Sequence, residues 1–101
     1  MLIVIADAWL TPEQKIAFQA LARPMIEASR AEAGCLGYWY AFDLLEPQRL
    51  RVNEIWKDRQ ALEFHFSTAH LKAFRKGLAG LKPRELKITV RELGAESALP
   101  A

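Results

Sequence analysis

Short runs of apolar residues along the chain predict four strands. The first run, LIVIADAWL at residues 2–10, is rich in branched side chains and is typical of a strand covered on both faces. Residues 35–45 form a long aromatic run, and residues 49–57 alternate between apolar and polar positions. The polar segment 46–48 between these two runs predicts the turn of a β-hairpin. A last run at residues 84–93 predicts the fourth strand.

The stretch after the first strand begins with signals for the start of a helix. Thr11 can cap the helix, Pro12 suits its first position, and Gln14 lies where a capping box requires it. We expect this helix to run to about Glu32, with Gly34 ending it. The residues expected on its core face are Ile16, Ala17, Ala20, Leu21, Pro24 and Ala28.

A second helical stretch precedes the fourth strand and is predicted in two pieces. Residues 59–66 form the first piece and residues 67–81 the second, because Ser67 or Thr68 can act as a fresh cap. Pro83 then breaks the helix.

The predicted order, β-α-β-β-α-β, is the split βαβ of α+β ferredoxin-like folds. Such a domain has a four-stranded antiparallel sheet with helices on one face. The first two strands carry apolar or aromatic residues on both faces, whereas a sheet open to water alternates more cleanly. We therefore expect one domain over residues 1–94, a flexible tail over residues 95–101, and a second copy packed on the bare face.

Composition narrows the function classes only modestly. The formal charge of +2 arises from 14 basic and 12 acidic residues without a basic stripe, which does not favour binding to nucleic acid or membranes. Cys35 is the sole cysteine, so no intrachain disulfide can form. The N-terminal residues lack the features of a signal peptide, and no apolar run approaches the roughly 20 residues that span a bilayer. We expect a cytoplasmic protein.

The two histidines, His65 and His70, are the main candidates for chemistry. On one continuous helix they would lie about 140° apart, on different faces, whereas helical zinc pairs use i, i+4 spacing. A cap at Ser67 or Thr68 could bring them together, but Cys35 and two histidines offer few other ligands of zinc type. We therefore expect no metal site. His65 shares the core-facing side of its helix, as a buried neutral histidine or as a proton carrier.

Two carboxylates in predicted strands raise a second question. Glu54 alternates with Val52 and Trp56 on one strand face, and Asp7 lies in an otherwise apolar strand. A buried carboxylate needs a partner, or else its pKa rises. The structural alternative to a role in chemistry is that such a carboxylate forms a salt bridge to a nearby arginine. The sequence contains no glycine-rich phosphate loop, nucleophile elbow or CxxC pair, so no nucleotide or flavin cofactor is indicated.

Residues 32–74 contain a series of spaced motifs: E-x-G-C-L-x-Y, D-x-x-x-P, E-x-W-x-D-x-x-A-L-x-x-H and S-x-x-H-x-x-x-F. The residues that form them are Glu32, Gly34, Cys35, Leu36, Tyr38, Asp43, Pro47, Glu54, Trp56, Asp58, Ala61, Leu62, His65, Ser67, His70 and Phe74. In these motifs the chain resembles the antibiotic biosynthesis monooxygenase family.

The resemblance implies a dimeric α/β barrel, a homodimer whose two ferredoxin-like sheets pack face to face. It also implies a monooxygenase that oxidises a quinol or polycyclic phenol with O₂ and uses no cofactor. His65 would be the base and His70 a proton relay or substrate donor. The residues expected to contact the substrate are Tyr38, Trp56 and Phe74 as walls, with Glu54 and Asp7 as polar groups.

The resemblance leaves other functions open. Related enzymes that process autoinducer sugars imply acid–base isomerisation or lysis of a small carbonyl compound, without O₂. A dimer of this type could also bind an apolar small molecule without catalysis. A haem-degrading branch is disfavoured, because Asp7, His65 and Arg75 stand where that branch has an asparagine, a tryptophan and a haem-ligating histidine.

Overall fold

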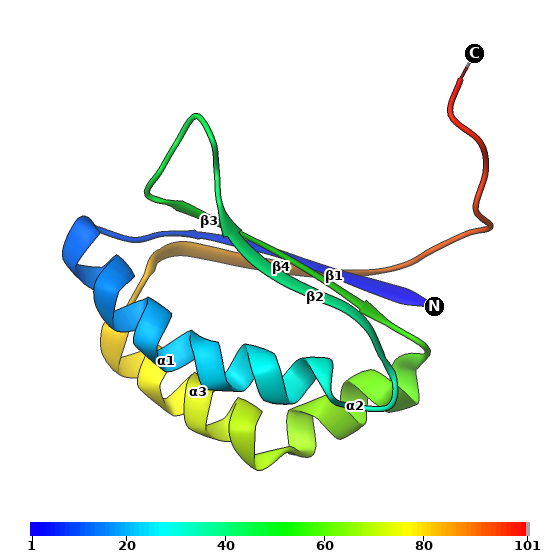
Figure 1. Cartoon of the computed structure of the whole chain (residues 1–101), viewed down its shortest axis with the longest axis horizontal. Coiled ribbons are helices and arrows are strands. Elements are labelled where there is room, and N and C mark those ends of the chain that lie inside the picture. The colour runs from blue at the N-terminus through cyan, green and yellow to red at the C-terminus, as the bar shows by residue number, and fades with distance from the viewer. Residues whose placement is uncertain (101) are drawn as a thin grey trace.

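A computed structural model describes residues 1–100 as one antiparallel sheet with helices packed on a single face (Figure 1). The sheet order is β2-β3-β1-β4. The predicted ferredoxin-like fold is therefore confirmed, and the second helical stretch is split in two, as its cap residues predicted. The elements are β1 (Leu2–Trp9), α1 (Pro12–Arg30), β2 (Cys35–Phe42), β3 (Arg49–Trp56), α2 (Arg59–Ser67), α3 (Ala69–Leu81) and β4 (Arg84–Glu92).

Strand alternation places one set of side chains between the sheet and the helices. In β1, Leu2, Val4, Ala6 and Ala8 are all buried, while the residues between them point to the other face. The same period in β2 and β3 directs their alternate residues toward the helices, so the three strands share one core. The core members from β2 and β3 are Tyr38, Leu50, Val52 and Trp56.

Helix α1 begins at the predicted capping box but buries a different face from the one expected. Gln14 N donates to Thr11 Oγ1 at 3.2 Å, and Thr11 N donates to Gln14 Oε1 at 2.8 Å. Ile16, expected in the core, is 76 % exposed. The buried positions are Phe18, Ala22, Met25 and Ser29. Apolar residues occur on several sides of this helix, so periodicity alone did not single out the stripe that meets the sheet.

The break between α2 and α3 lies at Thr68, which has extended backbone angles (φ −73°, ψ 149°). Thr68 Oγ1 accepts from Leu71 N at 3.3 Å and donates to the His65 carbonyl at 2.6 Å. One side chain thus ends α2 and starts α3. The change of direction at this point decides where the two histidines lie.

The sheet face opposite the helices combines apolar side chains with an ionic cluster. Ile5 and Trp39 are both exposed on this face. Asp7, also on this face, lies 3.6 Å from both Arg49 and Arg51. The apolar residues expected on both faces of β1 and β2 are therefore present, although this outer face is not purely apolar.

No helix within residues 1–100 combines the length and the apolar character that crossing a bilayer requires.

Candidate active site

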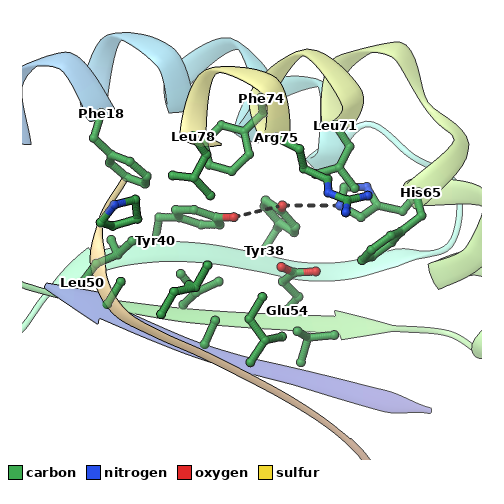
Figure 2. A pocket seen from close by; sticks show the side chains of 18 of the residues that line it. Phe18, Tyr38, Tyr40, Leu50, Glu54, His65, Leu71, Phe74, Arg75 and Leu78 are labelled. Atoms are coloured by element: carbon green, nitrogen blue, oxygen red, sulfur yellow. Dashed lines mark hydrogen bonds between the residues drawn. The ribbon is translucent and has the colours of Figure 1, made fainter. Parts of the chain in front are cut away.

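A cavity of about 530 Å³ lies between the sheet and the helices, and all seven elements contribute to its wall (Figure 2). The lining is largely aliphatic and aromatic. Exposed lining residues gather along α3 and β4, which places the cavity mouth beside the edge strand. The titratable groups of the lining are Tyr38, Tyr40, Glu54, His65, Arg75 and Lys82. A small set of polar groups in an apolar cavity is typical of a small-molecule site.

His65 reaches the cavity from the inward face of α2 and is only 1 % exposed. Leu62, three residues earlier, is buried beside it on the same helix face. The imidazole ring lies against the Trp56 indole, with 4.5 Å between ring centroids. Its Nε2 atom is 3.4 Å from the Tyr38 hydroxyl, in the interior of the cavity. The helix face and the indole thus aim Nε2 inward.

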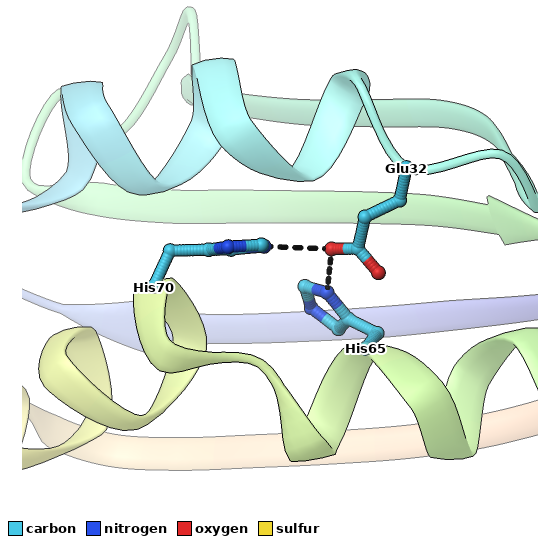
Figure 3. A group of neighbouring side chains, drawn as sticks. All are labelled: Glu32, His65 and His70. Carbon is cyan, nitrogen blue, oxygen red and sulfur yellow. Dashed lines mark hydrogen bonds and ion pairs between the residues drawn. The ribbon is translucent and has the colours of Figure 1, made fainter.

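Glu32, which follows α1, holds the other side of this imidazole (Figure 3). Its Oε2 atom lies 2.6 Å from His65 Nδ1 and 2.7 Å from His70 Nε2. The Glu32 side chain is only 5 % exposed. A carboxylate only accepts hydrogen bonds, so His65 carries its proton on Nδ1 and leaves a lone pair on Nε2. This is the geometry in which a carboxylate orients a histidine base.

Glu32 reaches His65 because the chain between α1 and β2 runs very close to α2. A Cβ atom added at Gly34 would lie 2.3 Å from the Ala61 Cβ, so only glycine fits there. The Gly34 carbonyl accepts from Lys57 N at 2.9 Å, which ties this segment to the end of β3. Close packing at Gly34 therefore positions the carboxylate.

Burial controls the protonation of the cavity groups. It lowers the pKa of His65, and the contact with Glu32 opposes this effect only in part, so the imidazole is neutral near pH 7. Burial also raises the pKa of Tyr38 and of Tyr40, so both keep their hydroxyl protons. The cavity thus holds one neutral base beside two hydroxyl groups.

Glu54 is a buried carboxyl group on the sheet side of the cavity. Its Oε1 atom accepts from Trp56 Nε1 at 3.0 Å. Burial raises the pKa of Glu54 to about 7, although the Trp56 hydrogen bond acts in the opposite direction. Its predicted partner, a nearby arginine, is on the other sheet face, where Arg49 and Arg51 pair with Asp7.

Glu32, His65 and His70 also form the one group within residues 1–100 whose donor atoms are close enough to surround a cation, all within 4.8 Å of one another. Zinc ligands bonded at about 2.0–2.2 Å lie roughly 3.3–3.5 Å apart in a tetrahedral site. The two shortest contacts, 2.6 Å and 2.7 Å, are instead those of hydrogen bonds to a shared oxygen. The group is accordingly a hydrogen-bonded triad in this structure.

The structure brings most, but not all, of the predicted site residues together. Tyr38, Glu54, His65 and Phe74 line the cavity. Three others lie outside its lining. Trp56 is fully buried behind His65, His70 is 24 % exposed on the far side of Glu32, and Asp7 is on the opposite face of the sheet.

Sequence reasoning assigned no role to Glu32 or Tyr40. Glu32 begins the E-x-G-C-L-x-Y motif, and that position was the only signal that could have identified it. Tyr40 follows Tyr38 by two residues, so strand alternation places both on one face, and their hydroxyls lie 3.3 Å apart. Arg75, exposed at the cavity mouth, stacks over Phe66 with 5.5 Å from its guanidinium carbon to the ring centroid.

Comparisons with known proteins agree with the fold and the motif. The family model for antibiotic biosynthesis monooxygenase matches residues 1–77. The chain is 32 % identical to YcnE of Bacillus subtilis, described as a candidate monooxygenase, over 73 % of this chain and 78 % of that protein. It is also 35 % identical to the uncharacterized protein sll1783 of Synechocystis sp., over 86 % of this chain but only 60 % of that longer protein.

Solved structures superpose along nearly the whole chain. A candidate antibiotic biosynthesis monooxygenase from Deinococcus radiodurans has a TM-score of 0.90 at 26 % identity, covering 100 % of both chains. Rv0793 from Mycobacterium tuberculosis has a TM-score of 0.85 at 29 % identity, covering 96 % of this chain and 98 % of that one.

Proposed function

Because the chain belongs to the antibiotic biosynthesis monooxygenase family, we propose that it oxidises a quinol or polycyclic phenol with O₂, without a bound cofactor. The observation that carries this proposal is the pairing of His65 with Glu32 at the wall of an apolar cavity. A neutral histidine with a free Nε2 lone pair can remove a phenolic proton. The cavity volume of about 530 Å³ suits a molecule of one or a few fused rings.

In the proposed mechanism, a substrate hydroxyl takes the place of the Tyr38 hydroxyl at His65 Nε2 and gives up its proton there. Glu32 stabilises the resulting imidazolium through Nδ1–H, as a buried carboxylate does for other histidine bases. The Tyr38 and Tyr40 hydroxyls, 3.3 Å apart, can donate to the phenolate oxygen. Proton removal makes the ring electron-rich enough to reduce O₂.

The overall reaction balances without another redox partner. One oxygen atom of O₂ enters the substrate and the other leaves as water, while the substrate itself supplies the electrons. The lining offers water few hydrogen-bonding partners, and apolar surroundings strengthen the hydrogen bonds to the phenolate.

The decisive experiment compares aerobic and anaerobic turnover on a panel of quinols and fused-ring phenols. We expect substrate loss coupled to O₂ uptake, with labelled oxygen from ¹⁸O₂ in the product, and no turnover under argon. Turnover that persists without O₂ would favour acid–base isomerisation, for which Glu54 and His65 offer two proton-transfer groups. Tight binding without any turnover would indicate a binding protein.

We also propose that the outer face of the sheet pairs with a second copy to form a homodimer. Ile5 and Trp39 are exposed there, with Trp39 47 % accessible. Sedimentation of the wild type should give a dimer mass, and Trp39→Glu should shift it toward the monomer. Ile16→Glu is the matched control, because Ile16 is exposed on α1, which covers the other face of the sheet. A monomeric wild type at micromolar concentration contradicts the proposal.

A further inference from the structure

Glu54 is a buried carboxyl group that the proposed mechanism does not use. In the register of the sheet, its neighbours are Tyr38 on β2 and Val4 on β1. All three side chains line the cavity on the helix side of the sheet. Figure 2 shows the carboxyl group on the sheet side, facing the tyrosines. The Glu54 carboxyl group therefore lies beside the space that a substrate ring would occupy.

No cation within residues 1–100 lies within 4.0 Å of Glu54 to compensate a negative charge there. Its one hydrogen bond, from Trp56 Nε1, occupies Oε1. The surrounding wall is apolar, with Val4 and Val52 on the neighbouring positions. An ionised carboxylate in such surroundings pays a large desolvation cost, whereas a neutral carboxylic acid does not.

The other titratable groups around the cavity do not make ionised Glu54 more favourable than neutral Glu54. Tyr38 and Tyr40 on β2 retain their protons, and β1 contributes no titratable group to the lining. Glu32, beyond His65, raises the pKa of Glu54 further, in the same direction as burial. Arg75 and Lys82 of the wall are exposed at the mouth, where water screens their charge.

We propose that Glu54 is a carboxylic acid that donates a hydrogen bond to an acceptor oxygen of the substrate. Glu54 and His65 both contact Trp56, so they act at the same end of the cavity. A substrate would then offer a hydroxyl to His65 and a second oxygen to Glu54. This inference rests on the proposed function for its substrate class. Among phenols, we expect the site to favour those with two oxygen atoms on one edge.

A first test is independent of any substrate. The carboxylic acid C=O band of wild-type protein, measured by infrared spectroscopy near neutral pH, should lose intensity in Glu54→Gln. The raised pKa of Glu54 also predicts how the stability of the folded protein changes with pH. A carboxyl with a raised pKa contributes stability that is complete below its ordinary pKa of 4.5 and is lost as pH rises through about 7. The melting temperature of wild type should therefore fall by several degrees relative to Glu54→Gln between about pH 5 and about pH 8.

The second test measures binding of a naphthol and of matched naphthalene diols under argon. Wild type should prefer a diol with adjacent oxygens by roughly tenfold at about pH 6, and lose that preference by about pH 8. Glu54→Gln should keep the preference at both values, because an amide still donates, and Glu54→Leu should abolish it. Naphthol serves as the reference in each protein, so the preference is the ratio of diol affinity to naphthol affinity within that protein.

The assignment is overturned if the wild-type preference for the diol does not change with pH, or if the preference persists in Glu54→Leu. An unchanged infrared band in Glu54→Gln does so as well. Both measurements are made without turnover, so the role of Glu54 can stand even if the protein consumes no O₂, and can fail even if it does.

Discussion

Replacing His65 with alanine is expected to lower kcat/KM for O₂-dependent turnover by about 10²–10⁴-fold, the usual contribution of a positioned general base. The reason is geometric. In the proposed mechanism, His65 Nε2 is the neutral base held at the cavity wall by a buried carboxylate, and the tyrosine hydroxyls beside it keep their protons. The measurement is initial O₂ uptake at limiting substrate.

Because His65 is buried, a second variant separates catalysis from folding. His65→Gln can still donate to Glu32 but cannot accept a proton near neutral pH. We expect both variants to keep the wild-type circular dichroism spectrum, and added imidazole to restore part of the activity of His65→Ala. Wild-type turnover in both variants would remove His65 from the mechanism.

The dependence of kcat/KM on pH in the wild type should also show the titration of His65. The base works only when neutral, so on a phenol with a single oxygen kcat/KM rises with pH through the pKa of His65 and then levels off. Burial lowers that pKa, so this rise should lie below the ordinary histidine value of 6.5. A rise centred well above that value would assign the base to another group.

Replacing Glu32 with glutamine is expected to lower kcat/KM by about 10²-fold or more, although Glu32 does not line the cavity. An amide can point either its oxygen or its nitrogen at His65 Nδ1, so the proton is no longer held on that atom. The amide also cannot stabilise the imidazolium that forms during proton transfer. Glu32 is thus a positioning residue, and its loss should act on kcat more than on KM.

The pH dependence distinguishes this role from a purely structural one. Glu32 raises the pKa of His65 against the effect of burial, so in Glu32→Gln the rise of kcat/KM should move to lower pH. Glu27→Gln is the matched control, because it makes the same charge change at an exposed site on α1. If Glu32→Gln behaves like Glu27→Gln in rate and in pH profile, Glu32 has no catalytic influence.

The sequence predicted the elements well because their signals are local. The Thr11 and Gln14 capping box, the alternation in β3 and the turn before Arg49 each act within a few residues. The fresh cap at Thr68 was predicted for the same reason. The core face of α1 was predicted wrongly, because several sides of that helix are apolar and only contact with the sheet selects one.

By itself, the sequence determined the order of strands and helices, the ferredoxin-like fold and the placement of His65 on the core-facing side of its helix. Only the tertiary structure decided what His65 contacts. Glu32 lies 33 residues away in the chain, and it reaches the imidazole because Gly34 lets the backbone pack against Ala61. Side-chain partners that meet through packing of separate elements leave no periodic signal in the chain. The placement of Asp7 on the outer face and of Glu54 in the cavity also depended on which sheet face the helices cover, a choice made by the whole fold.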